Sequence, residues 1–212
     1  MEEGKKELRK KMINLRYSLT QEEISRKSRR IFERLMSLGE YEKSGLIMGY
    51  MDFRNEVRTC DFIRDSLEMG KRVAIPYVTS MRCGIGEIAA SEIYDMKCDT
   101  APGRCGILEP AAGRLRIVNP GEIDLAVVPG VAFDKNGFRL GYGAGCYDGF
   151  LKNVRSDCLK VGVAFEIQIV EVVPTDEHDI PLDIVITEDR LIYRQYGNTT
   201  NAAKGQHGII QS

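Results

Sequence analysis

The sequence feature that most constrains the fold is a strand–helix–strand pattern over residues 44–76. Residues 44–51 and 72–76 are short apolar runs with the length expected of buried strands. Between them, residues 59–69 space their apolar side chains as a helix does, beginning at Thr59, a candidate N-cap. A strand, a helix and a second strand in succession predict parallel strands joined by a right-handed crossover.

Further short apolar runs extend this pattern toward the C-terminus. Three of them have the composition of buried strands: residues 123–128, 159–165 and 182–187. Residues 148–154 fit a helix, and residues 190–195 fit an edge strand that closes the sheet. We therefore predict one α/β domain over residues 1–195, with three layers (α/β/α), a mostly parallel sheet and helices on both faces.

Two helices are expected before the first strand. Residues 5–18 are basic and carry apolar side chains along one face. Thr20 starts the second helix, because Thr20 and Glu23 have the spacing of a capping box. We expect this helix to end at Gly39, since glycine is common just after a helix C-terminus.

The middle and the end of the chain give weaker patterns. Residues 84–89 predict a strand and residues 91–94 a short helical turn. Residues 98–110 are rich in glycine and proline and predict an extended surface crossing. Residues 196–212 are polar and lack a pattern, so we expect a tail outside the domain that is either flexible or artificial.

Composition excludes several classes of protein. The 212 residues include 30 basic and 31 acidic ones, a net charge of −1, which does not favour a nucleic-acid or membrane-surface partner. No apolar run approaches the roughly 20 residues that span a bilayer, and the N-terminus lacks the apolar segment of a secretory signal. The six cysteines include no C-x-x-C pair. We expect a cytoplasmic protein with reduced thiols.

The stretch that points to chemistry is PGVAFDKNGFRLGYGAGCYDGFL, residues 129–151. It follows a predicted strand and contains three alternating glycines: Gly141, Gly143 and Gly145. Glycines expose backbone N–H groups, and a helix that starts just after them attracts anions. With Arg139 before the glycines and Asp148 after them, the stretch indicates a nucleotide-phosphate site. A tight turn without a ligand is the alternative, because the spacing is not that of a P-loop.

Other charged residues fall where such a site could use them. Lys5 and Arg9 are four apart and share a helix face, and Glu56 and Asp183 lie near predicted strand ends. Ligands of parallel sheets bind beyond the carboxyl ends of the strands, so a common site is expected. Taken singly, each has a plainer explanation. Lys5 and Arg9 could form a solvated stripe, Glu56 could be a loop acid, and Asp183 could pair with a surface arginine. Asp148 could be an acid in the first turn of a helix.

Five motifs occur in an order that resembles one family. They are Lys5-x-x-Leu8-Arg9, Asn55-Glu56-Val57-x-Thr59, Gly106-Ile107-Leu108-Glu109-Pro110, the long glycine-containing stretch, and HDIPLD at residues 178–183. Together they resemble the 5-formyltetrahydrofolate cyclo-ligase family, also called 5,10-methenyltetrahydrofolate synthetases. The resemblance runs from about Lys5 to Glu188.

The resemblance implies an ATP- and Mg²⁺-dependent ligase. Such enzymes convert 5-formyltetrahydrofolate to 5,10-methenyltetrahydrofolate, form a C–N bond, and release ADP and phosphate. It also implies a fold similar to ribose-5-phosphate isomerase and CoA transferases, with a monomer or weak homo-oligomer as the expected state.

The same resemblance implies roles for individual residues. ATP would be bound by Lys5, Arg9, Arg139, Gly141, Gly143, Ala144, Gly145, Cys146 and Tyr147. The folate would be bound by Glu56, Met51 and Tyr147, although Met51 also fits the core. Arg139 and Tyr147 would be catalytic, and Mg²⁺ would be held by Asp148 and Asp183.

The glycine-containing stretch departs from the family pattern at four positions: Tyr142, Ala144, Cys146 and Gly149. Family members commonly have Arg at position 142, Gly or Lys at 144, Tyr at 146 and Arg at 149. This chain therefore has fewer cations around the triphosphate. Each lost charge-assisted hydrogen bond costs about 1.5–3 kcal/mol. Ala144 also adds a methyl group where the loop could require a positive φ. The alternatives are a divergent paralogue that binds folate or nucleotide with little turnover and, by fold analogy alone, a sugar-phosphate isomerase or transferase.

Overall fold

Five parallel strands form the centre of an eight-stranded sheet. The computed structural model describes residues 2–82, 85–103 and 106–195. The strands lie in the order β12 (Leu191–Tyr193), β11 (Ile184–Ile186), β10 (Leu159–Val163), β7 (Leu125–Val128), β1 (Leu46–Met48), β2 (Arg72–Arg82), β3 (Ile85–Ile93) and β6 (Ile117–Val118). The strands from β11 to β2 pair in parallel, whereas β12, β3 and β6 pair antiparallel at the two edges.

The predicted strand–helix–strand unit is confirmed. It consists of β1, α4 (Cys60–Glu68) and β2, and the two strands pair in parallel with Leu46 opposite Arg72. Thr59 precedes α4 as predicted, but its hydroxyl donates to the carbonyl oxygen of Tyr50 and does not cap the helix. That bond ties the start of α4 to the chain leaving β1.

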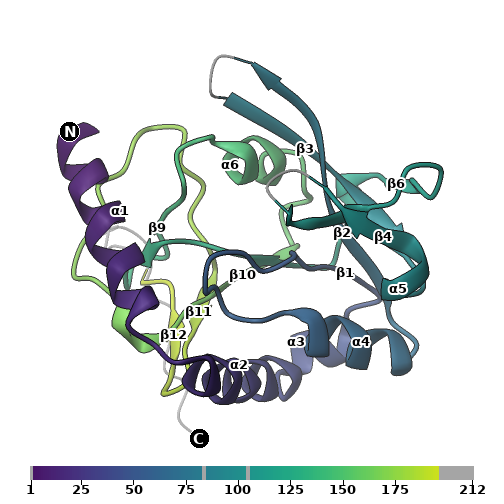
Figure 1. Cartoon of the computed structure of the whole chain (residues 1–212), viewed down its shortest axis with the longest axis horizontal. Helices are drawn as coiled ribbons and strands as arrows, with labels where there is room; N and C mark the ends of the chain where they lie inside the picture. The colour runs from purple at the N-terminus through teal and green to yellow at the C-terminus, as the bar shows by residue number, and fades with distance from the viewer. Residues whose placement is uncertain (1, 83–84, 104–105, 196–212) are drawn as a thin grey trace, which may run out of the picture.

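Helices cover both faces of the sheet, as predicted (Figure 1). On one face lie α2 (Gln21–Met36), α3 (Gly39–Lys43) and α4, and on the other lies the short helix α6 (Cys146–Leu151). The first helix, α1 (Glu2–Tyr17), packs beside the sheet against the chain that follows β7. No helix within the described ranges is both long and apolar enough to cross a membrane.

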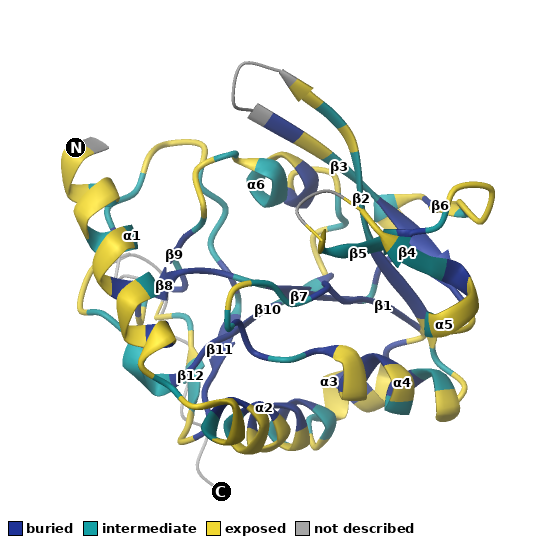
Figure 2. Cartoon of the chain, in the orientation of Figure 1, coloured by how far each residue is buried: buried dark blue, intermediate teal, exposed yellow. Residues whose placement is uncertain are grey.

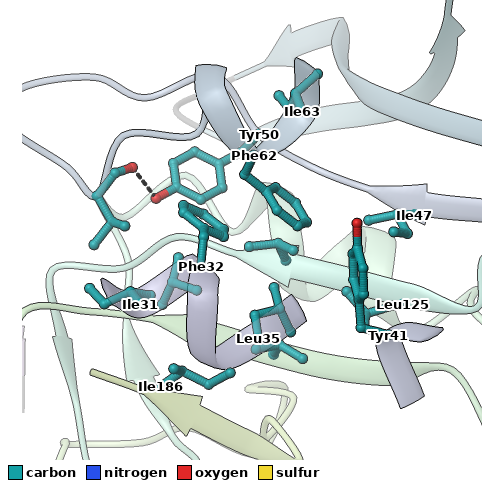
Figure 3. Close-up of a cluster of buried hydrophobic side chains, with 14 of the residues drawn as sticks. Ile31, Phe32, Leu35, Tyr41, Ile47, Tyr50, Phe62, Ile63, Leu125 and Ile186 are labelled. Atoms are coloured by element: carbon teal, nitrogen blue, oxygen red, sulfur yellow. Dashed lines mark hydrogen bonds between the residues drawn. The ribbon is translucent and has the colours of Figure 1, made fainter. Parts of the chain in front are cut away.

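The larger core lies between α2, α3, α4 and the sheet (Figure 2). Phe32 of α2 and Phe62 of α4 stack with their ring centroids 4.4 Å apart. Figure 3 shows these rings in one cluster with Ile47 and Leu125 of the two central strands. Tyr50 is buried there too, and its hydroxyl donates to the carbonyl oxygen of Val57 at 2.7 Å. Burial of this apolar surface fixes the segment that follows β1.

The capping box that starts α2 is confirmed, but the predicted end of this helix is wrong. Both hydrogen bonds between Thr20 and Glu23 are present. The helix stops at Met36, where the N–H of Ser37 still bonds to Glu33. Gly39 instead begins a separate short helix, α3. This helix places the Tyr41 side chain in the core.

The middle of the chain is more regular than its composition predicts. Residues 91–94 do not form a helical turn, because Ser91 pairs with Ile75 on one side and Ile117 on the other within β3. Residues 98–110 are not simply extended, since they include the end of α5 (Met96–Asp99), β4 (Thr100–Pro102) and β5 (Leu108–Pro110). The predicted tail, residues 196–212, lies outside the described residues.

A small hairpin that the sequence does not predict brings Arg139 to its place. It pairs β8 (Ala132–Phe133) with β9 (Arg139–Leu140). Its turn is closed by Asp134, whose carboxylate accepts from two backbone N–H groups, and by Gly137 with φ 82°. The carbonyl oxygen of Gly137 accepts from the N–H of Leu182 at 2.8 Å. Two short 3-10 helices, η2 (Pro120–Glu122) and η3 (Glu166–Gln168), complete the described elements.

Replacing Gly137 by alanine is expected to lower the free energy of unfolding by more than about 2 kcal/mol. The new Cβ would overlap the carbonyl oxygen of Leu182, and the positive φ disfavours any side chain. Urea unfolding measures the loss. Gly149→Ala in α6 is the control, because a Cβ there meets open space and a helical alanine is favoured over glycine. Equal stability of the two variants would contradict this account of the turn.

Candidate active site

Two polar segments leave the sheet at the same edge. Because β1 and β7 are parallel neighbours, the chain after each strand emerges at the carboxyl ends. After β1 come Tyr50, Met51 and the turn that carries Glu56, and after β7 come the β8–β9 hairpin and residues 141–145, the glycine loop. This edge of the sheet therefore holds most of the residues that the sequence singled out.

A cavity of about 600 Å³ lies between α1 and the glycine loop. Its polar lining contains three cations, three glycines and three carboxylates: Lys5, Arg9, Arg139, Gly141, Gly143, Gly145, Asp148, Asp176 and Asp179. The two acids at 176 and 179 were not predicted, although Asp179 belongs to the HDIPLD motif and Asp176 lies two residues before it. A concave site with cations and glycine backbone together suits a polyanion.

The face of α1 that carries Lys5 and Arg9 looks into this cavity and is not simply a solvated stripe. Met12 and Leu140 belong to one apolar cluster that joins the helix to β9. The Nε of Arg9 donates to the carbonyl oxygen of Gly141 at 2.8 Å. The Nζ of Lys5 lies 2.6 Å from the carboxylate of Asp176, so the cavity contains an internal ion pair. Burial alone lowers the pKa of Lys5, but its bonds to the acids outweigh this and raise it, so Lys5 is a cation.

The backbone of the glycine loop explains its glycines. Gly143 has φ 107°, and Gly145, with φ 65°, is the N-cap of α6. Only glycine adopts such values without strain. Ala144 has no positive φ, since the non-glycine residues with positive φ in the described chain are Arg54 and Asn55. The expected strain at Ala144 is therefore not observed.

Buried Arg139 and half-buried Asp148 form an ion pair that lines the cavity. The Nη2 of Arg139 lies 3.1 Å from Oδ1 of Asp148, and both side chains bond to the backbone of Ile180. The Arg139 guanidinium also lies 5.9 Å from the centre of the Tyr147 ring. The hairpin and α6 thus hold these three side chains together, as the sequence-based roles require.

The acids of the cavity fit a magnesium ion that arrives with phosphates. In the described ranges, no three His, Cys, Asp or Glu residues are grouped so that they could hold a metal by themselves. Mg²⁺ commonly uses only one or two carboxylates together with phosphate oxygens and waters. Asp148 lines the cavity and fits this requirement.

Asp183 does not meet Asp148, contrary to the placement that the sequence predicts. It precedes β11, so it lies at the amino ends of the parallel strands. Its carboxylate accepts from the N–H of Lys160 at 2.8 Å and pairs with the Lys160 ammonium at 2.9 Å. Asp183 is not part of the cavity lining. The structure pairs it with a lysine of the neighbouring strand.

A second cavity, of about 190 Å³, opens on the other side of the glycine loop. It brings together Glu56, Met51 and Tyr147, the three predicted substrate contacts. Its other walls are mainly apolar: Tyr50, Pro76, Val78, Ile88, Ile107, Leu108, Glu109, Pro129 and Cys146. Of these, the sequence singled out only Cys146 individually, and as a predicted ATP contact. The Gly-Ile-Leu-Glu-Pro motif was the signal for three of them. Pro76, Val78 and Ile88 come from the paired strands β2 and β3, whereas Tyr50 follows β1, Pro129 follows β7 and Cys146 begins α6.

Residues of the glycine loop and the start of α6 separate the two cavities. A small space of about 140 Å³ within this wall is lined by Arg139, the loop, Cys146, Tyr147 and Asp148. Tyr147 also lines the apolar cavity, whereas Asp148 lines the charged one. Burial raises the pKa of Tyr147, so its hydroxyl stays protonated and can donate a hydrogen bond. One short segment therefore faces both cavities.

Residues 1–188 match the sequence profile of the 5-formyltetrahydrofolate cyclo-ligase family. The chain belongs to this family. It is 31% identical to a probable 5-formyltetrahydrofolate cyclo-ligase of Caenorhabditis elegans, over 91% of this chain and 96% of that one. It is also 31% identical to 5-formyltetrahydrofolate cyclo-ligase of Mus musculus, over 88% and 94% of the two chains.

Solved structures of similar proteins agree with this family. The NMR structure of Aquifex aeolicus 5,10-methenyltetrahydrofolate synthetase superposes with a TM-score of 0.80 and 35% identity, covering 96% of this chain and 99% of that one. The Mycoplasma pneumoniae 5,10-methenyltetrahydrofolate synthetase gives 0.69 and 26%, covering 87% and 98%. These relatives confirm the α/β fold, and nothing in them favours the divergent alternative.

Within this cyclo-ligase chain, the carboxyl group of Glu56 is unusual. Its side chain is only 5% exposed, and Oε1 has no hydrogen-bond partner among the described residues. Burial raises the pKa of Glu56 to about 7, although the Arg16 guanidinium, the N–H of Phe53 and the Tyr142 hydroxyl oppose the rise. The Glu56 side chain lines a cavity that is otherwise largely apolar.

Arg16 is the functional candidate that the sequence analysis missed. It is 0% exposed and lies 3.7 Å from Oε1 of Glu56. A signal existed, since Leu8, Met12 and Arg16 follow one another at intervals of four and place an arginine on the apolar face of α1. A cation in that position is rarely buried without a partner.

The ionisation of Glu56 makes stability depend on pH in a defined direction. A folded pKa of about 7, above the ordinary value of 4.5, means that the folded state binds the proton more tightly. Its contribution to stability is present below pH 4.5 and is lost as the pH rises toward 7. Between pH 5 and pH 8, the wild type should lose about 2–3 kcal/mol more unfolding free energy than Glu56→Gln.

Chemical denaturation of both proteins at the two pH values measures this difference. Glu177→Gln is the matched control, because the Glu177 side chain is exposed and should leave the pH dependence unchanged. If Glu56→Gln has the same pH dependence as the wild type, Glu56 has an ordinary pKa.

Proposed function

We propose that this chain converts 5-formyltetrahydrofolate to 5,10-methenyltetrahydrofolate, using ATP and Mg²⁺ and releasing ADP and phosphate. The observation that carries the proposal is the shared wall: the segment from Arg139 to Asp148 borders a cationic cavity on one side and an apolar, acid-containing one on the other. A reaction that transfers a phosphoryl group from ATP to a folate requires two such sites in contact. Membership of the cyclo-ligase family supports the same chemistry.

The cationic cavity is suited to the triphosphate of ATP. Phosphoryl transfer depends mostly on positioning and on neutralising charge, so it needs cations and backbone N–H groups. Lys5, Arg9 and Arg139 supply the cations, and the glycine loop supplies accessible backbone at the start of α6. Phosphates would replace Asp176 as the partner of Lys5.

Asp148 is the residue that we propose to hold Mg²⁺. The ion would neutralise charge on the phosphate oxygens. Asp148 now pairs with Arg139, so the two side chains would separate toward the ion and the phosphates respectively. Asp183 remains a prediction from the resemblance, and its bond with Lys160 does not support a shared site.

The apolar cavity is suited to the pterin end of the folate. Met51, Pro76 and Val78 provide flat apolar contact. The unpartnered Oε1 of Glu56 would accept a hydrogen bond from a ring N–H, which would satisfy a buried acceptor. The remainder of the folate would extend beyond this small space.

The two substrates would react at Tyr147. The formyl oxygen attacks the γ-phosphorus, and the bond from that phosphorus to ADP breaks. The neighbouring folate nitrogen then attacks the formyl carbon, loses its proton to solvent, and phosphate leaves with the former formyl oxygen. The Tyr147 hydroxyl can donate to that oxygen, and Arg139 next to it can stabilise the charge of the transferred phosphate.

The activity is tested by mixing the protein with Mg-ATP and 5-formyltetrahydrofolate and following the absorbance of the methenyl product. Product should form only when ATP is present. No product at high protein concentration, with both ligands shown to bind, would overturn the proposal. The cytoplasmic location, the monomer or weak homo-oligomer and the lack of a nucleic-acid partner stay predictions.

Asp148→Asn should lower kcat/KM for Mg-ATP by at least about 100-fold, because it removes the carboxylate charge that holds the ion. Thermal melting should show that the variant folds. Asp157→Asn is the control, since Asp157 is an exposed acid that pairs with Arg155 outside both cavities. Normal turnover by Asp148→Asn would contradict the metal role.

A further inference from the structure

Arg16 joins α1 to three other segments with one guanidinium group. Its Nη2 donates to the carbonyl oxygen of Arg54 at 2.9 Å and to the hydroxyl of Tyr142 at 2.5 Å. Its Nη1 donates to the carbonyl oxygen of Gly130 at 3.4 Å and lies 3.7 Å from Oε1 of Glu56. These partners lie in the turn after β1, the chain after β7, and the glycine loop.

The first of these segments is strained and needs support. Arg54 and Asn55 have φ values of 49° and 57°, the left-handed conformation that non-glycine residues avoid. The turn is closed by the N–H of Glu56, which donates to Phe53, and by the N–H of Phe53, which donates to the Glu56 carboxylate. Arg16 adds a bond to Arg54 at the middle of the turn, so it helps to hold the turn that carries Glu56 beside the apolar cavity. Strain held in this way is typical of functional sites.

The second segment is the glycine loop, and Tyr142 is the side chain that connects it to Arg16. Arg9 holds the carbonyl oxygen of Gly141, and the N–H of Gly86 in β3 donates to Ala144 at 2.9 Å. The Arg16 guanidinium lies 5.8 Å from the centre of the Tyr142 ring as well as at its hydroxyl. The position of the loop relative to Glu56 therefore depends on the bond between Arg16 and Tyr142.

A purely structural role does not explain this arginine well. Burying a guanidinium carries a large desolvation penalty, and an apolar side chain would fill the space without it. The Nε of Arg16 and Oε1 of Glu56 are the buried side-chain atoms that lack a hydrogen-bond partner among the described residues. The pair therefore keeps hydrogen-bonding capacity that no described residue uses.

We propose that Arg16 is a positioning residue that, through Tyr142, couples the nucleotide side of the site to the folate side, so that each substrate strengthens the binding of the other. This inference rests on the proposed function. A nucleotide that orders the glycine loop fixes Tyr142, and Tyr142 fixes Arg16 and the turn of Glu56. The same contacts act in reverse when folate binds first, because a coupling free energy is reciprocal.

The test is calorimetric titration of 5-formyltetrahydrofolate with and without a non-hydrolysable ATP analogue and Mg²⁺. In the wild type, the analogue should lower the Kd of the folate by at least about fivefold. In Tyr142→Phe, which removes only the hydroxyl, this factor should fall to about one, while the Kd of each ligand alone changes less than about threefold. Tyr17→Phe, an exposed tyrosine of α1, should keep the wild-type factor.

A second variant tests the guanidinium itself. Arg16→Lys keeps the charge but cannot reach Arg54, Gly130 and Tyr142 together, so it should lose the coupling and weaken folate binding. Arg26→Lys on the exposed side of α2 is its control, and thermal melting checks that both variants fold.

The outcomes separate this inference from the proposed function. A wild type that binds neither ligand overturns the proposed function. A wild type that binds both ligands without mutual enhancement, or a Tyr142→Phe protein that keeps the full enhancement, overturns the coupling and leaves the proposed function standing.

Discussion

The parallel pairing of β1 with β7 is the constraint on which the whole site depends. Ile47 lies opposite Leu125, although the two strands are far apart in the sequence. Since both strands run in the same direction, the chains that leave them must share one edge of the sheet. The acid-bearing turn and the glycine loop are therefore neighbours by topology. The apolar core beneath them makes this arrangement rigid, because β1 and β7 are fully buried.

Charges in the site are already paired before any substrate arrives. Lys5 bonds to Asp176, Arg139 to Asp148, and Arg16 faces Glu56. These pairs compensate the positive charges of the cavity. A ligand group can replace the internal partner of each pair if it carries the same sign of charge. Binding then replaces one ion pair by another, which limits the desolvation cost. This arrangement suits a site that must bind and release a polyanion.

The changed residues of the glycine loop are less damaging than their charges suggest. Tyr142 stands where the family resemblance predicts an arginine, yet its hydroxyl lies against the guanidinium of Arg16. A cation is therefore present near this part of the loop, supplied from α1. Ala144 has an ordinary backbone conformation, and Gly149 lies where a side chain would meet open space. The structure thus gives no physical reason for loss of activity at these two positions.

Much of the fold could be predicted because local periodicity carries it, as in the strand–helix–strand unit and the capping box at Thr20. What failed depended on distant partners. Residues 91–93 belong to a strand because β2 and β6 pair with it on both sides, at residues 75 and 117 for Ser91. Asp183 was correctly placed near the end of a strand, but only the parallel pairing of β11 with β10 shows that this end lies opposite the edge that carries the glycine loop. The spacing of Leu8, Met12 and Arg16 indicated an arginine on the apolar face of α1, but its partners Arg54, Gly130 and Tyr142 are distant in the sequence.

The most direct measurement is a structure of the protein with Mg²⁺, a non-hydrolysable ATP analogue and 5-formyltetrahydrofolate. The account predicts that the triphosphate lies between Lys5, Arg9 and the glycine loop, with the pterin ring against Glu56 and the formyl group beside Tyr147. Either ligand bound outside these two cavities, or the two bound with the glycine loop not between them, would contradict it.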